Sequence, residues 1–264
     1  MVLAPNSPMR PRAAACPTRL HWKYPLDLLC IVMSLPLILP LMVLIGLWIK
    51  LISRGPALLR QQRIGRHGRP FAMYKFRSME MNSKTQDHEA YVRELVQSDR
   101  PMRKLELIGD SRMIAGGRLL RASGLDELPQ LLNVLDGQMS LVGPRPCLPA
   151  EYALFTSRQR ERFNALPGLT GLWQATGKNQ STFREMNALD IHYVRNVSPR
   201  MDLEILLRTP AALLRQMQLT FRHRSMGARG PSLAPSSVGT PRYSHPGNTT
   251  SYPDRPARFG PHWI

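Results

Sequence analysis

The sequence predicts an α+β protein that is mostly helical and follows an N-terminal membrane helix. Three observations predict this class. An uncharged apolar run covers Leu28–Ile49, two short mixed segments flank a turn at Gly65–Gly68, and several later segments place apolar residues at helical spacing. With 264 residues, the chain is long enough for one domain with a sizeable core plus extensions.

We expect four regions along the chain. Residues 1–20 are rich in Pro, Ala and Arg and should be disordered, and residues 21–52 should form the membrane helix. Residues 53–221 should form the main domain. Residues 222–264 carry many Pro, Ser, Gly and Arg and a single acid, Asp254, which is typical of a disordered basic tail.

The chain is strongly basic. It has 36 Lys and Arg against 18 Asp and Glu, a formal net charge of +18 and a pI near 10.9. This charge implies an anionic partner, which is nucleic acid, anionic lipid or a phosphorylated metabolite. The three cysteines, Cys16, Cys30 and Cys147, are far apart and lack metal-ligand spacing, which argues against a disulfide framework or a zinc site.

The apolar run has the length of a membrane helix. At ~1.5 Å per residue it would extend about 33 Å, against ~30 Å for a bilayer core. Lys50, Leu51 and Ile52 follow it in place of a small-residue cleavage site, which argues against a secretory signal peptide.

Two features distinguish this run from an ordinary spanning helix. Pro36 and Pro40 lie inside it, where proline kinks a helix. Basic residues flank both ends, whereas a spanning helix usually carries its positive flank on the cytoplasmic side only. A helix that enters, bends near Ser34–Pro36 and leaves by the same face fits these features. From the residues alone, this re-entrant form and a single transmembrane helix are equally supported.

The two mixed segments, Ala57–Ile64 and Pro70–Phe76, predict a β-hairpin. In the second segment and the residues that follow it, strand alternation would place Lys75 and Arg77 on the same face. Two cations on one face can hold a phosphate group. A solvated strand face is the alternative, and the residues alone favour it.

The most informative stretch is GLDELPQLLNVLDGQMSLVGPRP, which begins at Gly124. Asp126 is expected to be the N-cap of a helix, with Pro129 in its first turn. As an isolated observation, this capping role is favoured over a chemical one. The apolar face predicted for that helix comprises Leu128, Leu131, Leu132 and Leu135.

The same stretch could also take part in a reaction at a phosphate group. A carboxylate that is kept ionised by a helix N-terminus can attack phosphorus or bind a metal, which fits Asp126. The adjacent Glu127 could hold Mg²⁺ or move a proton. Arg145, between Pro144 and Pro146, would offer a rigid bidentate phosphate contact, with an exposed arginine in a chain-reversing turn as the alternative.

Two further expectations concern the C-terminal third of the domain. Asp190 is interpreted as a structural polar contact. Thr209 and Pro210 are expected to begin a helix. The face of that helix should carry Leu213, Leu214, Met217 and Phe221, and a core position and a membrane-interface position are equally supported for it.

Several segments resemble one known family. They are KYPLDLLCIVMSLPLILP, RQQRIG, YKFRSM, the stretch from Gly124 to Pro146, LPGLTGLWQATGKN and LDIHYV, in this order between about His21 and Gln218. The chain resembles the bacterial sugar transferases, which are monotopic polyprenyl-phosphate phosphoglycosyl transferases. The segment TGLWQATGKN is most similar to the corresponding segment of members that serve exopolysaccharide synthesis. Without the additional N-terminal membrane helices of the larger members, the chain resembles a small form.

The resemblance implies an activity. A UDP-sugar would donate its sugar-1-phosphate to polyprenyl (undecaprenyl) phosphate and release UMP, as the initiating step of exopolysaccharide or other surface polysaccharide synthesis. The reaction would take place at the cytoplasmic face of the bacterial inner membrane, in contact with membrane lipid, and downstream glycosyltransferases would use the product.

The resemblance also implies roles for particular residues. Asp126 would be the nucleophile and Glu127 its catalytic partner, with Mg²⁺ against both. Lys75, Arg77 and Arg145 would bind substrate. The membrane helix would be re-entrant, although Leu35 here separates Ser34 from Pro36, where many members have an adjacent Ser-Pro pair.

One alternative function fits the composition. A non-enzymatic, membrane-attached basic protein could bind anionic lipid or an acidic polymer through its charge and its tail. Nucleic acid is not an expected partner, because the sequence has no recognisable recognition module and such a function would leave the membrane run unexplained.

Overall fold

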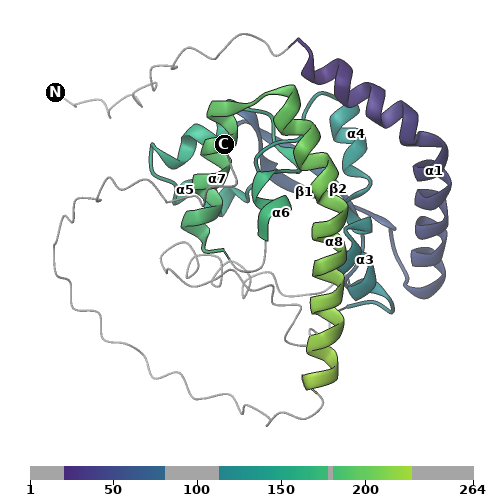
Figure 1. Cartoon of the computed structure of the whole chain (residues 1–264). Coiled ribbons are helices and arrows are strands. Elements are labelled where there is room, and N and C mark those ends of the chain that lie inside the picture. The colour runs from purple at the N-terminus through teal and green to yellow at the C-terminus, as the bar shows by residue number, and fades with distance from the viewer. Residues whose placement is uncertain (1–20, 81–112, 178–180, 228–264) are drawn as a thin grey trace, which may run out of the picture. The chain divides into compact units, whose positions relative to one another are not determined.

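The computed structural model describes residues 21–80, 113–177 and 181–227. The expectations for the segment 1–20 and for most of the tail lie outside these residues. The polar and charged segment 82–107, for which the sequence predicts a surface helix and loop, also lies outside them. Over the described chain, the structure is mostly helical, as predicted, and contains the predicted hairpin and a second small sheet that was not predicted (Figure 1). The helices are α1 (Lys23–Ile52), α3 (Gly117–Ser123), α4 (Gln130–Leu135), α5 (Pro149–Ala153), α6 (Leu172–Gly177), α7 (Phe183–Asn196) and α8 (Pro199–Gly227), with 3₁₀ turns η1 (Arg66–Gly68), η3 (Leu125–Glu127) and η4 (Gln159–Asn164). The strands are β1 (Leu58–Ile64), β2 (Pro70–Phe76), β3 (Ser140–Val142) and β4 (Gly168–Thr170).

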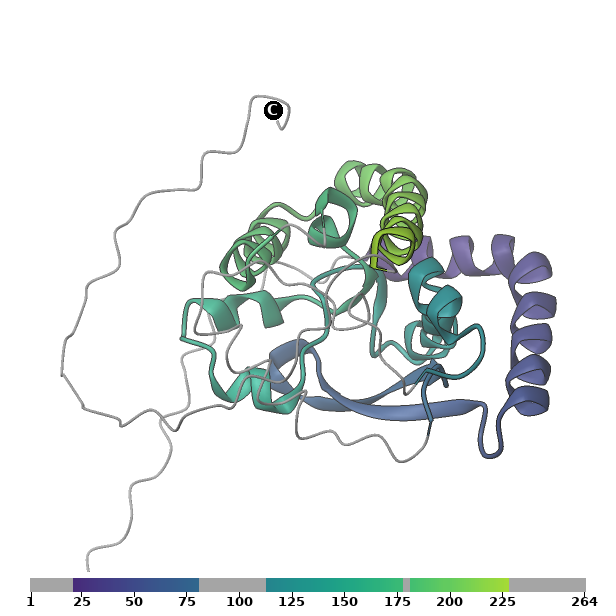
Figure 2. The ribbon, with the colours of Figure 1, turned by 90° about the horizontal axis from the view of Figure 1, so that it is seen from below.

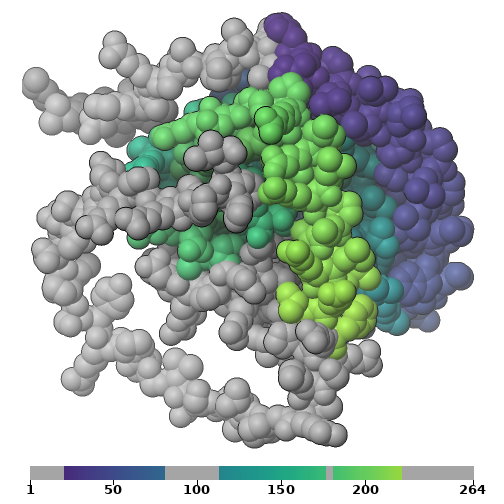
Figure 3. All heavy atoms as spheres, viewed as in Figure 1, coloured from purple at the N-terminus to yellow at the C-terminus, as the bar shows by residue number. Residues whose placement is uncertain are grey.

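Helix α1 is long and apolar enough to cross a membrane. It contains Pro36 and Pro40, and Figure 2 shows that it is sharply bent, as expected from proline inside a helix. Most of its apolar side chains are exposed, and Figure 3 shows α1 on the surface of the molecule. A helix buried in a core would hide these side chains, so their exposure indicates association with a membrane.

The N-terminal end of α1 is fixed to the rest of the protein by buried polar contacts. Lys23 forms an ion pair with Asp202 of α8 and donates to the Tyr193 hydroxyl of α7 at 2.9 Å. Ser140 of β3 donates to Asp27 at 2.6 Å. These contacts tie α1 to three elements that are distant in sequence.

Strands β1 and β2 form the predicted antiparallel hairpin, with Leu58 opposite Phe76 and Ile64 opposite Pro70. The side chain of Asn133, fully buried in α4, bonds to the free edge of β2. Its amide nitrogen donates to the Ala72 carbonyl at 2.8 Å, and its oxygen accepts from the Tyr74 N–H at 3.0 Å. One amide side chain thus takes the place of a neighbouring strand and fixes α4 against the hairpin.

The second sheet consists of β3 and β4, which are parallel. It depends on a close approach of two loops, since the Gly143 N–H donates to Thr170 and the Gly168 N–H donates to Pro144, each at 2.9 Å. A Cβ on Gly143 would lie 2.4 Å from the Leu166 carbonyl oxygen, so a larger residue would separate the strands. The loop that carries Pro144 is therefore held against the start of β4.

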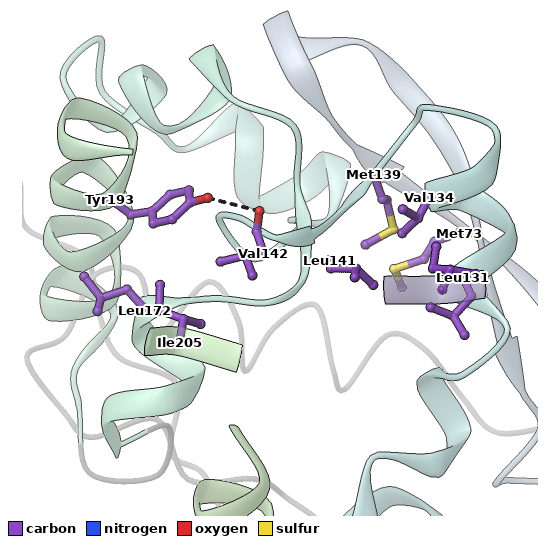
Figure 4. Close-up of a cluster of buried hydrophobic side chains, with 10 residues drawn as sticks. Met73, Leu131, Val134, Met139, Leu141, Val142, Leu172, Tyr193 and Ile205 are labelled. Atoms are coloured by element: carbon purple, nitrogen blue, oxygen red, sulfur yellow. Dashed lines mark hydrogen bonds between the residues drawn. The ribbon is translucent and has the colours of Figure 1, made fainter. Parts of the chain in front are cut away.

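The main core lies between the hairpin, α4, the second sheet and the C-terminal helices (Figure 4). Met73 of β2 packs there with side chains of α4 and β3. Tyr193 of α7 donates to the Val142 carbonyl at 3.2 Å, beside Leu172 and Ile205.

Two helix predictions were wrong. No helix begins at Thr209: α8 begins at Pro199 and continues through Pro210, because Ser198 accepts from the backbone at its start and α8 packs against α3, α6 and the second sheet. It also extends to Gly227, beyond the expected domain boundary at 221. In α4, Leu131 of the predicted apolar face is buried, but Leu132 and Leu135 are exposed, and Gln130, Asn133 and Val134 are buried in their place.

We predict that Asn133→Ala lowers the free energy of unfolding by about 3 kcal/mol, equivalent to ~10 °C in Tm. The substitution removes the partner of the Ala72 carbonyl and of the Tyr74 N–H at this partly buried strand edge. Thermal unfolding of the purified protein measures this loss. Asn196→Ala, at an exposed asparagine of α7, is the control and should change stability by less than ~0.5 kcal/mol. Equal losses in the two variants would contradict the role assigned to Asn133.

Candidate active site

Asp126 and Glu127 lie in the 3₁₀ turn η3, between α3 and α4. The prediction that Asp126 caps the following helix was wrong. The N-cap of α4 is Pro129, the N-cap of η3 is Gly124, and neither position shows a side-chain capping bond. Gly124 has φ of 74°, a left-handed conformation that glycine adopts without strain, so it ends α3 and turns the chain directly into the two acids.

The two acids differ in exposure. Asp126 is 5% exposed, and the side chain of Glu127 is about one-third exposed. The Lys75 ammonium lies 3.3 Å from a carboxylate oxygen of Glu127. The structure thus brings together two of the predicted site regions, the basic end of β2 and the acidic pair, although 52 positions separate the two residues. The Asn133 bond to β2 explains this meeting, since α4 directly follows η3.

Arg77 takes a different place from Lys75. It is fully buried, and its terminal nitrogens donate to the main-chain carbonyls of Ser53 at 2.7 Å and Arg54 at 2.6 Å. These carbonyls follow the C-terminus of α1, where cationic donors are favoured. Arg77 thus joins the end of the membrane helix to the hairpin, and its role in substrate binding stays a prediction.

Arg145 is paired with Glu151. Its guanidinium contacts both carboxylate oxygens at 3.1–3.4 Å, and Glu151 also accepts from the Leu148 N–H at the start of α5. Burial alone would raise the pKa of Glu151, but the charges of Arg145 and Arg63 outweigh it and hold the pKa below its ordinary value. Glu151 is therefore ionised at neutral pH.

A second ion pair fixes the main chain at this position. Arg162 of η4 is fully buried, forms an ion pair with Asp190 of α7 and donates to the Arg145 carbonyl at 2.7 Å. Burial raises the pKa of Asp190 to about 6, with Arg162 opposing the rise. The prediction that Asp190 makes a structural contact is confirmed. The loop at Arg145 is held at its side chain by Glu151 and at its carbonyl by Arg162.

The sequence interpretation did not place Arg63 beside the candidate site. It lies near the end of β1, is 7% exposed, and has its pKa lowered to about 10 by burial and by Arg145. The charges of Glu151 and Glu127 oppose this shift, so Arg63 interacts electrostatically with Glu127 as well as with the Arg145 loop. The signal available in sequence was RQQRIG, in which Arg63 is one of two arginines that strand alternation places on opposite faces.

The donor set at Asp126 and Glu127 suits one metal type in particular. Among the described residues there is no cluster of three or more His, Cys, Asp or Glu side chains, so a closed protein cage of the zinc type is not formed there. Mg²⁺ is commonly bound by one or two carboxylates together with substrate phosphates. The adjacent acids fit that mode, and the Lys75 ammonium lies beside Glu127.

Comparison with known proteins identifies similar chains. The family model described as bacterial sugar transferase matches residues 18–216. The undecaprenyl-phosphate galactose phosphotransferase of Salmonella typhimurium is 42% identical over 197 residues, which cover 72% of this chain and 40% of that protein. The UDP-glucose:undecaprenyl-phosphate glucose-1-phosphate transferase of Caulobacter vibrioides is also 42% identical over 197 residues, covering 72% of this chain and 68% of that protein. The exopolysaccharide production protein ExoY of Sinorhizobium fredii is 37% identical over 196 residues, 71% of this chain and 84% of that protein. The match thus spans well under half of the Salmonella protein and most of the Sinorhizobium protein.

We predict that Glu151→Gln lowers the free energy of unfolding at neutral pH by about 3 kcal/mol, because it leaves Arg145 without its buried counter-charge. The folded-state pKa of Glu151 lies below its ordinary 4.5. Its stabilisation is therefore complete above pH 4.5 and is lost as the pH falls through the lowered pKa.

Thermal unfolding of wild type and Glu151→Gln at pH 7 and at pH 4 measures this effect, and the difference between them should shrink at the lower pH. Glu161→Gln removes an acid from an exposed ion pair with Arg195 and serves as the control. A difference that is constant with pH, or no larger than that of the control, would show that Glu151 is not a stabilising charge.

Proposed function

The chain belongs to the bacterial sugar transferase family, and on this basis we propose that it transfers a sugar-1-phosphate from a UDP-sugar to undecaprenyl phosphate and releases UMP. This would be the initiating step of exopolysaccharide or another surface polysaccharide synthesis. The similar proteins named for undecaprenyl-phosphate sugar transfer support this activity. The observation that carries it in the structure is the contact of Lys75 with Glu127, next to the buried Asp126.

In the proposed mechanism, a carboxylate oxygen of Asp126 attacks the β-phosphorus of the UDP-sugar. The bond between that phosphorus and the bridging oxygen breaks, and UMP leaves with the bridging oxygen. An oxygen of the lipid phosphate then attacks the same phosphorus, the bond to Asp126 breaks, and the carboxylate is regenerated. A carboxylate nucleophile divides one difficult transfer into two easier ones.

The surrounding residues would contribute position and charge. Lys75 would neutralise phosphate oxygens beside Glu127, and Arg145 would contact phosphate from the opposite loop. Mg²⁺, held by Asp126 and Glu127, would supply further neutralisation of the diphosphate. Glu127 would accept or return protons at its carboxylate, which its partial exposure permits.

Helices α1 and α8 support a location at a membrane surface. The bend in α1 fits a re-entrant helix, with both ends on the cytoplasmic side of the inner membrane. Helix α8 has five exposed large apolar side chains among the described residues. Four of them, Leu203, Leu207, Leu214 and Phe221, lie on one face, because they are spaced by about one or two turns. We propose that this face lies in the membrane interface, where an amphipathic helix is stable.

We predict that Asp126→Asn lowers UMP release at least about 10³-fold, because the amide cannot act as the nucleophile. The assay contains purified protein, Mg²⁺, undecaprenyl phosphate and one UDP-sugar at a time. Asp136→Asn, an exposed acid after α4, is the matched control and should retain wild-type release. Turnover by Asp126→Asn at the wild-type rate would refute the assignment of the nucleophile. The absence of UMP release from every UDP-sugar by wild type would favour the non-enzymatic, lipid-binding alternative.

The re-entrant arrangement predicts that both ends of α1 face the same compartment. Cysteines at the exposed positions His21 and Arg54, introduced one at a time into a cysteine-free chain, should both resist a membrane-impermeant maleimide in spheroplasts. Both should react after the membrane is opened. Reaction of one of the two in intact spheroplasts would instead establish a spanning helix.

A further inference from the structure

Three buried or half-buried arginines lie around the Arg145 loop, and only two of them have a carboxylate partner among the described residues. Arg145 is paired with Glu151, and Arg162 is paired with Asp190. Arg63 is close enough to Arg145, Glu151 and Glu127 for their charges to act on it. No described carboxylate lies within ion-pair distance of its guanidinium.

The contacts of Arg63 do not replace such a partner. One terminal nitrogen donates to the Gln61 side chain at 2.8 Å, and the other reaches the Pro146 carbonyl at 3.4 Å. The Nε atom is buried without a hydrogen-bond partner in the described chain. A buried charge that is neither paired nor fully hydrogen-bonded is costly to the folded state. This cost is offset if an anion binds there.

The position of Arg63 fits an anion that binds beside the Arg145 loop. Gln61 lies two residues earlier on the same face of β1, and Pro146 directly follows Arg145. The charge of Glu127, one of the two adjacent acids, also acts on Arg63. A group that contacts Arg63 would therefore lie beside the Arg145 loop and within electrostatic reach of Glu127.

We propose that Arg63 is an anion-binding residue that holds a phosphate oxygen of a substrate, an inference that rests on the proposed sugar-phosphate transfer. Its planar guanidinium suits phosphate because several N–H groups can bond to one or two oxygens. The phosphate belongs either to the diphosphate of the UDP-sugar or to the polyprenyl phosphate. Their shared chemistry is a phosphate oxyanion, and the binding experiments below distinguish them.

The test compares ligand binding and stability for the full chain in detergent. The variants are Arg63→Gln, Arg63→Lys and, as the matched control, Arg195→Gln, which removes an exposed arginine from a surface ion pair. The ligands are UDP, pyrophosphate and a polyprenyl phosphate, with uridine and the corresponding polyprenol as uncharged controls. Calorimetric titration gives Kd, and thermal unfolding without ligand gives Tm.

We expect Arg63→Gln to weaken binding of at least one phosphate ligand about 10- to 100-fold, the range for loss of a charge-assisted hydrogen bond. The affinity for the uncharged controls should not change. The phosphate affinity of Arg63→Lys should lie between those of Arg63→Gln and wild type. The Tm of ligand-free Arg63→Gln should equal or exceed that of wild type, because an unpaired buried charge has been removed. A purely structural arginine would lower Tm instead.

The outcomes separate the two sources and the two proposals. A loss confined to UDP and pyrophosphate assigns the anion to the nucleotide, and a loss confined to polyprenyl phosphate assigns it to the lipid. Wild-type affinity for all phosphate ligands in Arg63→Gln, or a clear fall in its ligand-free Tm, overturns the inference. A last outcome separates the two proposals. If wild type binds pyrophosphate and Arg63→Gln does not, but wild type releases no UMP from any UDP-sugar, the anion site stands and the enzymatic proposal fails.

Discussion

The buried amide of Asn133 is the contact on which the geometry of the candidate site depends. Its hydrogen bonds to the open edge of β2 place α4, and with it the turn at Asp126 and Glu127, beside Lys75. The two peptide groups at that strand edge need partners because α4 partly buries them, and one side-chain amide supplies both a donor and an acceptor. A leucine at this position would bury more apolar surface but would leave the strand edge unpaired.

Around this contact the charges divide into two sets. Glu127 and Lys75 form a partly exposed pair, whereas Arg145 and Arg162 are held by buried carboxylates. The buried pairs contribute orientation more than net stability, because desolvation offsets much of their attraction. The charge of Arg63 interacts with Glu127 of the first set and with Arg145 and Glu151 of the second. An anion bound at Arg63, as proposed, would therefore interact with both sets.

The membrane helix is part of the same arrangement. Ser140, which anchors α1 through Asp27, lies in β3, and that strand leads within a few residues to the loop of Arg145. At the other end of α1, Arg77 links the helix terminus to the hairpin that carries Lys75. The helix thus contacts both motifs that would meet a phosphorylated substrate, which is the connection needed if one substrate resides in the bilayer.

The sequence by itself determined the features that depend on local pattern: the apolar run at Leu28–Ile49, the hairpin around Gly65–Gly68, and the order of motifs that marks the family. Tertiary structure decided the rest. Packing against the domain extended α8 through Pro210, and a left-handed glycine rather than a helix start positioned Asp126. The environment of Arg63 was also hidden, because charges far apart in the chain meet only after folding, and burial determines whether an arginine is a solvated surface group or an unpaired cation.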